Sequence, residues 1–204
     1  MITTNDELST LCDAVRQTTA VALDTEFVRT RTYYPQLGLI QLFDGERTAL
    51  IDPLNITDWS PLQAILQDRN ITKFLHAGSE DLEVFMNTFG SMPQPLIDTQ
   101  VLAAFCGRPM SWGFAPMVAE YSGVELDKSE SRTDWLARPL TTRQCDYAAA
   151  DVWYLLPIAH KLMAETEQAG RLDWALNECH LMQQRRQEVT DPADAWRDIT
   201  NAWQ

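Results

Sequence analysis

The chain lacks several features that would assign it to a protein class at once. Its three histidines form no H-x-x-H or H-E-x-x-H pattern. No run of about 18 apolar residues is present, so we expect no transmembrane helix. The first residues lack the basic and apolar regions of a signal peptide, which favours a cytoplasmic protein. No C-x-x-C pair exists, which argues against a thiolate metal site and a disulfide framework; the scattered cysteines are Cys12, Cys106, Cys145 and Cys179.

Basic residues are also scarce. Sixteen Lys and Arg stand against 29 Asp and Glu, which gives a formal net charge of −13. Nucleic-acid-binding domains usually carry a basic surface, because phosphate contacts supply much of the affinity, so this charge argues against a general nucleic-acid binder. A bound metal would offset part of the acidic charge. The cations also cluster: Arg29 and Arg31 follow the first acidic motif, and Lys128 and Arg132 share a predicted loop.

The hydrophobic pattern predicts one globular domain of alternating strands and helices. The 45% hydrophobic content of 204 residues is enough for a substantial core. Periodicity predicts strands at 20–28, 37–43, 48–52, 71–76 and 96–98, with Asp44-Gly45 as a hairpin turn. It predicts helices at 5–17, 60–67, 79–89 (capped by Ser79), 99–106, 112–121, 141–165 and 168–182. This order implies an α/β fold with a mixed central sheet flanked by helices, the plan of ribonuclease-H-like folds.

We place the domain at residues 1–182. Residues 183–204 read as a linker and the start of a C-terminal region that this sequence does not contain. The polar run Q-Q-R-R-Q-E and Asp191-Pro192 mark this change. A short helix is expected to carry Trp196 and Trp203.

Acidic residues stand inside otherwise apolar segments, where a carboxylate is costly unless it is neutralised. Asp24 and Glu26 lie two apart in the strand V-A-L-D-T-E-F and therefore share a face. Two such carboxylates repel each other unless a cation lies between them. Mg²⁺ and Mn²⁺ prefer oxygen ligands of this kind, so the strand predicts a divalent metal site.

Further candidates come from two helices. Tyr147 and Asp151 lie four apart and share a helix face, which continues into the core. Asp81 lies in the first turn after a predicted strand, a position that ligand sites favour, whereas Glu80 points to solvent. Each pattern alone is common. Their combination, order and placement on strand, helix start and late helix make the signal specific.

These residues resemble the 3′–5′ exonucleases of the DEDD class with a tyrosine in the last motif, and within that class the ribonuclease D family. The similar segments are D-T-E-F-V-R-T-R-T-Y-Y-P-Q-L-G-L-I-Q-L (24–42), H-A-G-S-E-D-L-E-V-F (76–85), L-D-K-S-E-S-R-T-D-W-L-A-R-P-L (126–140) and Y-A-A-A-D-V-W-Y-L-L-P (147–157). The resemblance covers about residues 1–180. The helical RNA-binding domains of full-length family members are missing here.

The resemblance implies hydrolysis of the 3′-terminal phosphodiester with release of nucleoside 5′-monophosphates. Two divalent metal ions, Mg²⁺ or Mn²⁺, would be held by Asp24, Glu26, Asp81 and Asp151, and Tyr147 would orient the attacking water. The implied substrate is a single-stranded RNA 3′ end, as in tRNA precursors, and a monomer without membrane contact is expected. By resemblance, the backbone near Thr25 and Phe27 is expected to contact the terminal 3′-hydroxyl. His76 is a candidate because it ends a strand that faces the site. Lys128 and Arg132 are candidates for phosphate contacts, and Trp135 for stacking on a base.

Three alternatives remain open. A DNA 3′–5′ exonuclease uses the same motifs, and the sequence contains no residue that can be shown to read the 2′-hydroxyl. A non-catalytic RNA-binding module with a relic site is disfavoured because all five site residues are present. A phosphatase acting on small molecules would fit the acidic charge but not the basic loop. His76 and Trp135 can also be structural, and Lys128 and Arg132 can be solvated.

Overall fold

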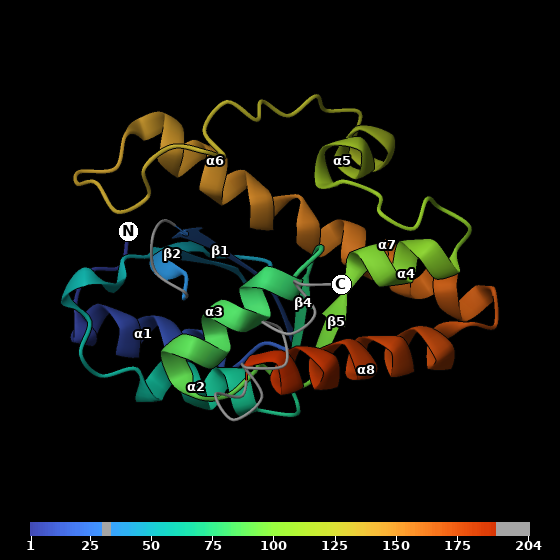
Figure 1. Cartoon of the computed structure of the whole chain (residues 1–204), viewed down its shortest axis with the longest axis horizontal. Helices are drawn as coiled ribbons and strands as arrows, with labels where there is room; N and C mark the ends of the chain where they lie inside the picture. The colour runs from blue at the N-terminus through green and yellow to red at the C-terminus, as the bar shows by residue number, and fades with distance from the viewer. Residues whose placement is uncertain (30–33, 191–204) are drawn as a thin grey trace, which may run out of the picture.

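A five-stranded mixed sheet forms the centre of the molecule, in a computed structural model that describes residues 1–29 and 34–190 (Figure 1). The strands are β1 (Ala20–Val28), β2 (Gln36–Phe43), β3 (Thr48–Ile51), β4 (Thr72–Leu75) and β5 (Leu96–Asp98). Their order is β3-β2-β1-β4-β5. The β1–β2 and β2–β3 pairs are antiparallel, and the β1–β4 and β4–β5 pairs are parallel. The predicted meander followed by crossovers is confirmed, and the fold is ribonuclease-H-like.

Helices cover both faces of this sheet (Figure 1). One face packs against α1 (Asn5–Val15), α2 (Ser60–Gln67) and α3 (Ser79–Phe89). The other packs against α4 (Thr99–Phe105), α5 (Phe114–Ser122), α6 (Thr142–Trp153) and α7 (Leu155–Gln168). The short 3₁₀ turn η1 (Pro53–Asn55) follows β3, and α8 (Leu172–Thr190) packs on α3, α4 and β5.

Strand alternation decides which side of β1 carries the acidic residues. Val21 and Leu23 enter the core cluster beneath α1, α2 and α3, whereas Ala22 enters the cluster beneath α7. Because successive side chains point to opposite faces, Asp24 and Glu26 continue the side of Ala22. That side also faces α6, which carries the remaining candidate acid.

The predicted helix at 141–165 is two helices, α6 and α7, which meet at Tyr154. Pro157 explains the break. A proline lacks the N–H that would donate to the carbonyl of Trp153, and its ring crowds that carbonyl. Leu155 in the same run, Y-L-L-P, is still buried in the core, so the apolar face of α6 continues into α7 although the two helices are separate.

Smaller differences concern helix ends. Ser79 is the first residue of α3 rather than its cap; Gly78 holds the cap position and no side-chain capping bond forms. Helix α8 runs beyond residue 182 to Thr190, so the polar segment that was expected to end the domain begins as helix. The domain boundary itself stays a prediction, and Trp196 and Trp203 lie outside the described residues. In the part of the chain that the structure describes, none of the helices has the length and apolar character to cross a membrane.

Candidate active site

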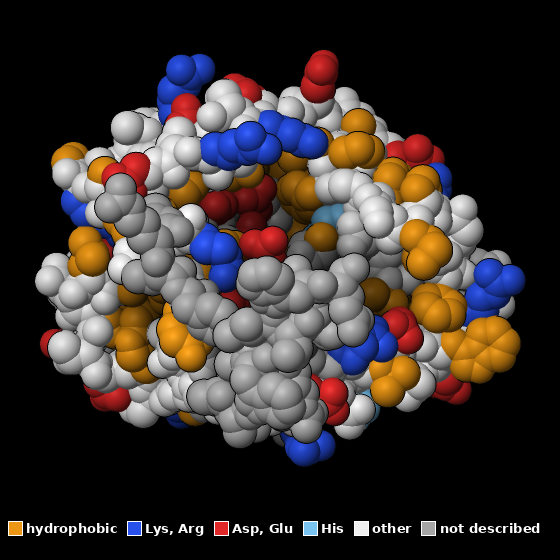
Figure 2. Space-filling model, in the orientation of Figure 1, with side chains coloured by type: hydrophobic (Ala, Val, Ile, Leu, Met, Phe, Trp, Pro, Cys, Tyr) orange, Lys and Arg blue, Asp and Glu red, His pale blue; other side chains and the backbone are white. Residues whose placement is uncertain are grey.

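A pocket of about 740 Å³ opens where the parallel strands β1 and β4 end. It is lined by β1, by the turn between β4 and α3, by α6 and by residues 126–131 of the loop before α6. Figure 2 shows acidic side chains at the bottom of a hollow, with Lys and Arg side chains along its rim. Ligand sites of α/β folds favour this edge of the sheet, and the volume is in the range of small-molecule sites.

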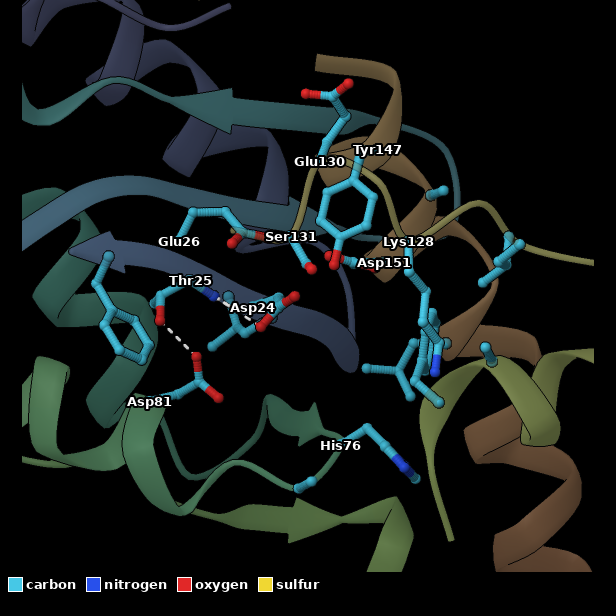
Figure 3. A pocket seen from close by; sticks show the side chains of 18 of the residues that line it. Asp24, Thr25, Glu26, His76, Asp81, Lys128, Glu130, Ser131, Tyr147 and Asp151 are labelled. Atoms are coloured by element: carbon cyan, nitrogen blue, oxygen red, sulfur yellow. Dashed lines mark hydrogen bonds between the residues drawn. The ribbon is translucent and has the colours of Figure 1, made fainter. Parts of the chain in front are cut away.

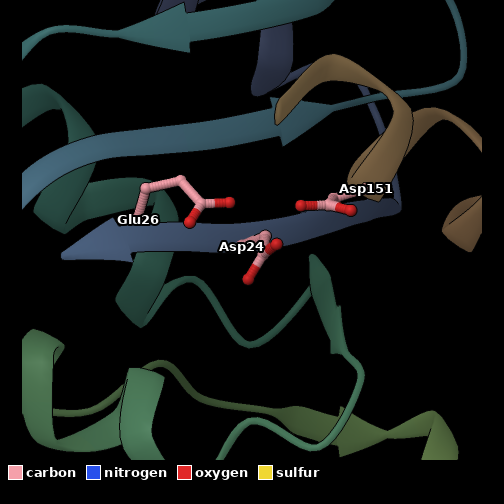
Figure 4. A group of neighbouring side chains, drawn as sticks. All are labelled: Asp24, Glu26 and Asp151. Carbon is pink, nitrogen blue, oxygen red and sulfur yellow. The ribbon is translucent and has the colours of Figure 1, made fainter. Parts of the chain in front are cut away.

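Three carboxylates converge at the bottom of this pocket (Figure 4). One oxygen each from Asp24, Glu26 and Asp151 lies within 4.8 Å of the others. β1 supplies the first two through its alternation, and α6 supplies the third from its inner face. The start of α6 is fixed by a capping box in which Thr141 and Gln144 satisfy each other's backbone N–H groups. The sequence prediction that strand and late helix meet at one acidic centre agrees with this geometry.

Asp81 reaches the same pocket from the first turn of α3 (Figure 3). Its carboxylate accepts a hydrogen bond from the hydroxyl of Thr25, a residue that is only 4% exposed. Thr25 points to the opposite face of β1 from its two acidic neighbours, so this bond ties α3 to the strand. Asp81 is not one of the three clustered ligand residues, and its link to a metal stays a prediction.

Burial and mutual repulsion set the protonation of these acids. Burial raises the pKa of Glu26 to about 9, and the charge of Asp24 adds to the effect. Burial is also the main cause of the raised pKa values of Asp24 and Asp151. Burial raises the pKa of Asp81 to about 6, although the hydrogen bond from Thr25 opposes the shift. Carboxylates forced together in this way are suited to a divalent cation, which compensates their charge.

Tyr147 lies one helical turn before Asp151, and its phenol reaches the carboxylates (Figure 3). Burial, followed by the charges of Asp151, Glu26 and Asp24, raises the pKa of this phenol well above its ordinary value. A hydrogen bond with the Ser131 side chain opposes the shift. The phenol is therefore protonated at neutral pH and able to donate a hydrogen bond.

The candidate substrate contacts divide into two groups. Thr25, Phe27, His76 and Lys128 line the pocket as expected. Both ring nitrogens of His76 already have partners, Thr99 Oγ1 at 2.8 Å and the Trp112 carbonyl at 2.7 Å, so its visible role is structural.

The other two candidates do not reach the cavity. Arg132 is exposed and lies outside the pocket lining. Trp135 is 1% exposed and packs against Leu39, Leu50 and Ala148, with its ring 6.1 Å from that of Tyr147. This burial corrects the expectation of base stacking, because the indole has no free face to offer.

Three residues of the site escaped the sequence prediction. Gln41 is fully buried opposite Asp24 in the β1–β2 ladder, and its side-chain N–H donates to Glu26 at 3.2 Å. The only signal for it was a polar residue within an apolar strand. Ser131 and Arg143 also line the pocket. Arg143 was detectable in principle, because it precedes Tyr147 by one helical turn and so shares its face.

Comparison with known proteins places this geometry in a family. A family model described as a 3′–5′ exonuclease matches residues 1–167. Ribonuclease D of Escherichia coli strain K12 is 80% identical over all 204 residues, and the chain spans 54% of that protein's length. The crystal structure of E. coli RNase D, described as an exoribonuclease involved in structured RNA processing, superimposes with a TM-score of 0.95 over 100% of this chain and 54% of that one.

A more distant structure shows a metal. Brucella melitensis NrnC with bound Mg²⁺ is 28% identical, with a TM-score of 0.73 over 85% of this chain and 86% of that one. The family match covers most of the present sequence. The matched residues include the four acids Asp24, Glu26, Asp81 and Asp151 and the tyrosine Tyr147, and all five also line the pocket. The chain belongs to the 3′–5′ exonuclease family.

Proposed function

We propose that this chain is the catalytic domain of a metal-dependent 3′–5′ exoribonuclease that releases nucleoside 5′-monophosphates. The observation that carries the proposal is the convergence of Asp24, Glu26 and Asp151 at the bottom of one pocket. The chain spans about half the length of the ribonuclease D relatives it matches, so the activity of the whole protein is part of the proposal.

The donor set supports a divalent cation. Its members are carboxylate oxygens, the ligands that Mg²⁺ and Mn²⁺ prefer, and their burial makes an uncompensated charge costly. Asp24, Glu26 and Asp151 would hold a first ion, and Asp24 with Asp81 would hold a second. When bound, such ions supply an activated water and stabilise the leaving 3′ oxygen. Two ions, and the choice between Mg²⁺ and Mn²⁺, are proposed rather than observed.

The remaining groups of the pocket position the reactants. The protonated Tyr147 phenol donates a hydrogen bond and thereby orients the attacking water, a role that its raised pKa favours over that of a base. Thr25 and Phe27 lie beside the acids, where they can contact the terminal nucleotide. Lys128 at the rim is placed to meet a phosphate.

RNA is the proposed substrate, and a tRNA precursor is the proposed natural one. The similarity to E. coli RNase D, described as acting in structured RNA processing, supports RNA over DNA. DNA remains the second candidate, because the same acids hydrolyse either backbone. We further propose a cytoplasmic monomer, in keeping with the sequence expectation.

The test is a gel time course on 5′-labelled single-stranded RNA with Mg²⁺. The same RNA with a blocked 3′-hydroxyl and a DNA of equal sequence are run beside it. We expect a one-nucleotide ladder that shortens from the 3′ end of the open RNA and is absent on the blocked strand. Asp24→Asn and Asp151→Asn should lose turnover by about 10³-fold or more, since each removes a charge that the metal requires. Asp13→Asn, an exposed acid on α1, is the matched control.

Two results would contradict the proposal. Normal turnover in Asp24→Asn or Asp151→Asn would remove the acids from the reaction. A faster ladder on DNA than on RNA would replace the proposed substrate with the second candidate.

A further inference from the structure

Another buried carboxylate lies outside the acidic site, at the end of β5. Asp98 is 1% exposed. It accepts hydrogen bonds from three backbone N–H groups: Ala77 at 3.0 Å, Gly78 at 2.9 Å and Gln100 at 2.8 Å. The Gln100 bond is an ordinary N-cap of α4. The other two cross from β5 to the turn after β4, about 20 residues away in the sequence.

The turn at Ala77 and Gly78, whose N–H groups donate to Asp98, has a strained backbone. Ala77 has φ +52°, a left-handed conformation that a residue with a Cβ adopts at a cost and keeps only where its surroundings impose it. The next residue, Gly78, is packed against β4, because a Cβ there would lie 3.0 Å from side-chain atoms of Leu75. The carboxylate of Asp98 holds the N–H groups of both residues, and ionic acceptors make stronger hydrogen bonds than neutral ones.

This turn determines where α3 begins. Gly78 is the N-cap of α3, offers no side chain for capping, and its carbonyl accepts from the N–H of Leu82 at 2.9 Å. Asp81 lies in that first turn and reaches the pocket from there. A change in the Ala77–Gly78 backbone would therefore move the start of α3 and the carboxylate of Asp81 together.

We propose that Asp98 is a positioning residue for the nuclease site: it clamps the strained Ala77–Gly78 turn and thereby holds Asp81 in the pocket. The expected effect on kcat rests on the proposed function, whereas the hydrogen bonds from Ala77 and Gly78 to Asp98 do not depend on it. From the opposite side, the backbone N–H of Asp98 donates to Cys179 Sγ on α8 at 3.4 Å, so the clamp is anchored in two layers of the fold.

Asp98→Asn tests the clamp with little change in shape. Asparagine keeps one acceptor oxygen and turns an NH₂ group toward a backbone N–H that needs an acceptor. We expect amide exchange at Ala77 and Gly78 to accelerate about tenfold or more, as the loss of a charge-assisted bond implies. Mn²⁺ affinity, followed through the electron paramagnetic resonance signal of the free ion, should fall in the same direction as in Asp81→Asn. On RNA, kcat should fall about tenfold, with KM changed less than twofold.

A second change separates positioning from general damage. Glycine adopts φ near +52° without strain, so Ala77→Gly removes the need for the clamp. In the double variant Ala77→Gly/Asp98→Asn we expect kcat and Mn²⁺ affinity to recover most of their loss. Asp44→Asn is the matched control, since Asp44 is also buried and accepts from the N–H groups of Glu46 and Arg47 at 2.8 and 2.6 Å, but in the β2–β3 turn outside the pocket. It should lower the melting temperature without changing kcat or metal affinity.

Two outcomes overturn the inference. Unchanged amide exchange at Ala77 and Gly78 in Asp98→Asn would show that the carboxylate does not hold the turn. A loss of thermal stability in Asp98→Asn with wild-type kcat and Mn²⁺ affinity would reduce Asp98 to a structural acid like Asp44. If wild type fails to shorten RNA while Asp98→Asn still weakens Mn²⁺ binding, the proposed function fails and the positioning role stands.

Discussion

At the scale of single residues, Tyr147 makes a prediction that separates orientation from proton transfer. Its phenol stays protonated, because burial and three nearby carboxylates raise its pKa. Tyr147→Phe removes only the hydroxyl, so we expect kcat to fall about a hundredfold, within the range for one positioned catalytic group, with little change in KM or Mg²⁺ dependence. Single-turnover kinetics on RNA measures this.

Tyr121→Phe is the matched control, because the Tyr121 hydroxyl bonds to Glu165 at 2.8 Å outside the pocket. Its rate should equal that of wild type. A Tyr147→Phe enzyme with unchanged kcat would mean that the phenol does not touch the reacting water.

A second residue predicts how stability depends on pH. Lys73 on β4 is fully buried, and its ammonium group donates to the Asp68 carbonyl at 2.6 Å and the Gln94 carbonyl at 2.9 Å. Burial lowers the pKa of Lys73 from 10.5 to about 8. Between these two values the unfolded chain binds more protons than the folded one, so the contribution of Lys73 to the free energy of unfolding rises with pH.

Lys73→Met should remove this contribution. We therefore expect the stability of the variant relative to wild type to worsen as pH increases from 8 to 10. Urea unfolding at pH 7, 8, 9 and 10 gives the difference directly. Parallel curves for the two proteins would show that Lys73 titrates normally in the folded state. Lys161→Met on α7, an exposed lysine, is the control.

At the scale of elements, Arg138 fastens the loop before α6 to the sheet. Its guanidinium donates to Asp52 at 2.9 and 3.1 Å, to the Gly38 carbonyl at 2.8 Å, and to the carbonyls of Trp135 and Ala137 at 2.8 and 3.0 Å. These bonds hold the loop so that the Trp135 ring lies 6.1 Å from the ring of Tyr147. The loop therefore supports the face of α6 that carries Tyr147.

Lysine cannot replace that fork, because it offers a single point of attachment. We expect Arg138→Lys to lower the free energy of unfolding by about 2 kcal/mol, as the loss of several hydrogen bonds in a largely buried pair implies. Arg47→Lys, in an ion pair whose arginine is half exposed, should cost less than about 1 kcal/mol. Equal losses in urea unfolding of both variants would show that Arg138 is only a surface contact.

The elements also show how far the sequence predicts this fold. Every strand and most helices were predicted within a few residues, because each has its own apolar period, and the acids were found because they interrupt it. The predictions that failed concern residues whose environment depends on contacts between elements. The burial of Trp135 follows from Gly38, whose absent Cβ would lie 2.6 Å from the Trp135 carbonyl. No local sequence pattern predicts that Gly38 and Trp135 pack this closely.

The same reason explains the residues that were missed. Gln41 joins the site through strand pairing, and Asp98 reaches the Ala77 turn through a crossover between β4 and β5. Both became visible only when the sheet brought distant segments together. The break between α6 and α7, in contrast, was available from Pro157 and was missed because the apolar stripe runs through it.

At the scale of the whole molecule, the proposed function requires an acidic domain to bind a polyanion. The net charge of −13 repels RNA at long range, so the cations at the pocket rim carry the attraction. Lys128 and Arg143 are exposed and line the pocket that contains the carboxylates. Hydrogen bonds with Ser129 are the main cause of the lowered pKa of the neighbouring Asp127, and the positive charge of Arg143 adds to that shift. Figure 2 shows Lys and Arg side chains along this rim.

Neutralising this pair should weaken binding without slowing the chemistry. For Lys128→Gln/Arg143→Gln we expect KM to rise about tenfold or more while kcat stays unchanged. The slope of log(kcat/KM) against log[salt] should become smaller in magnitude by about 1 to 2, because each lost phosphate contact removes roughly 0.7 from the slope on a single strand. Arg69→Gln/Lys161→Gln removes the same charge at exposed positions outside the pocket and should leave the slope near that of wild type. If both double variants lose the same slope, the net charge of the domain governs RNA capture. If only the rim pair does, a local phosphate contact overcomes the repulsion of the acidic surface, and the proposed action on RNA is compatible with a domain that has few cations.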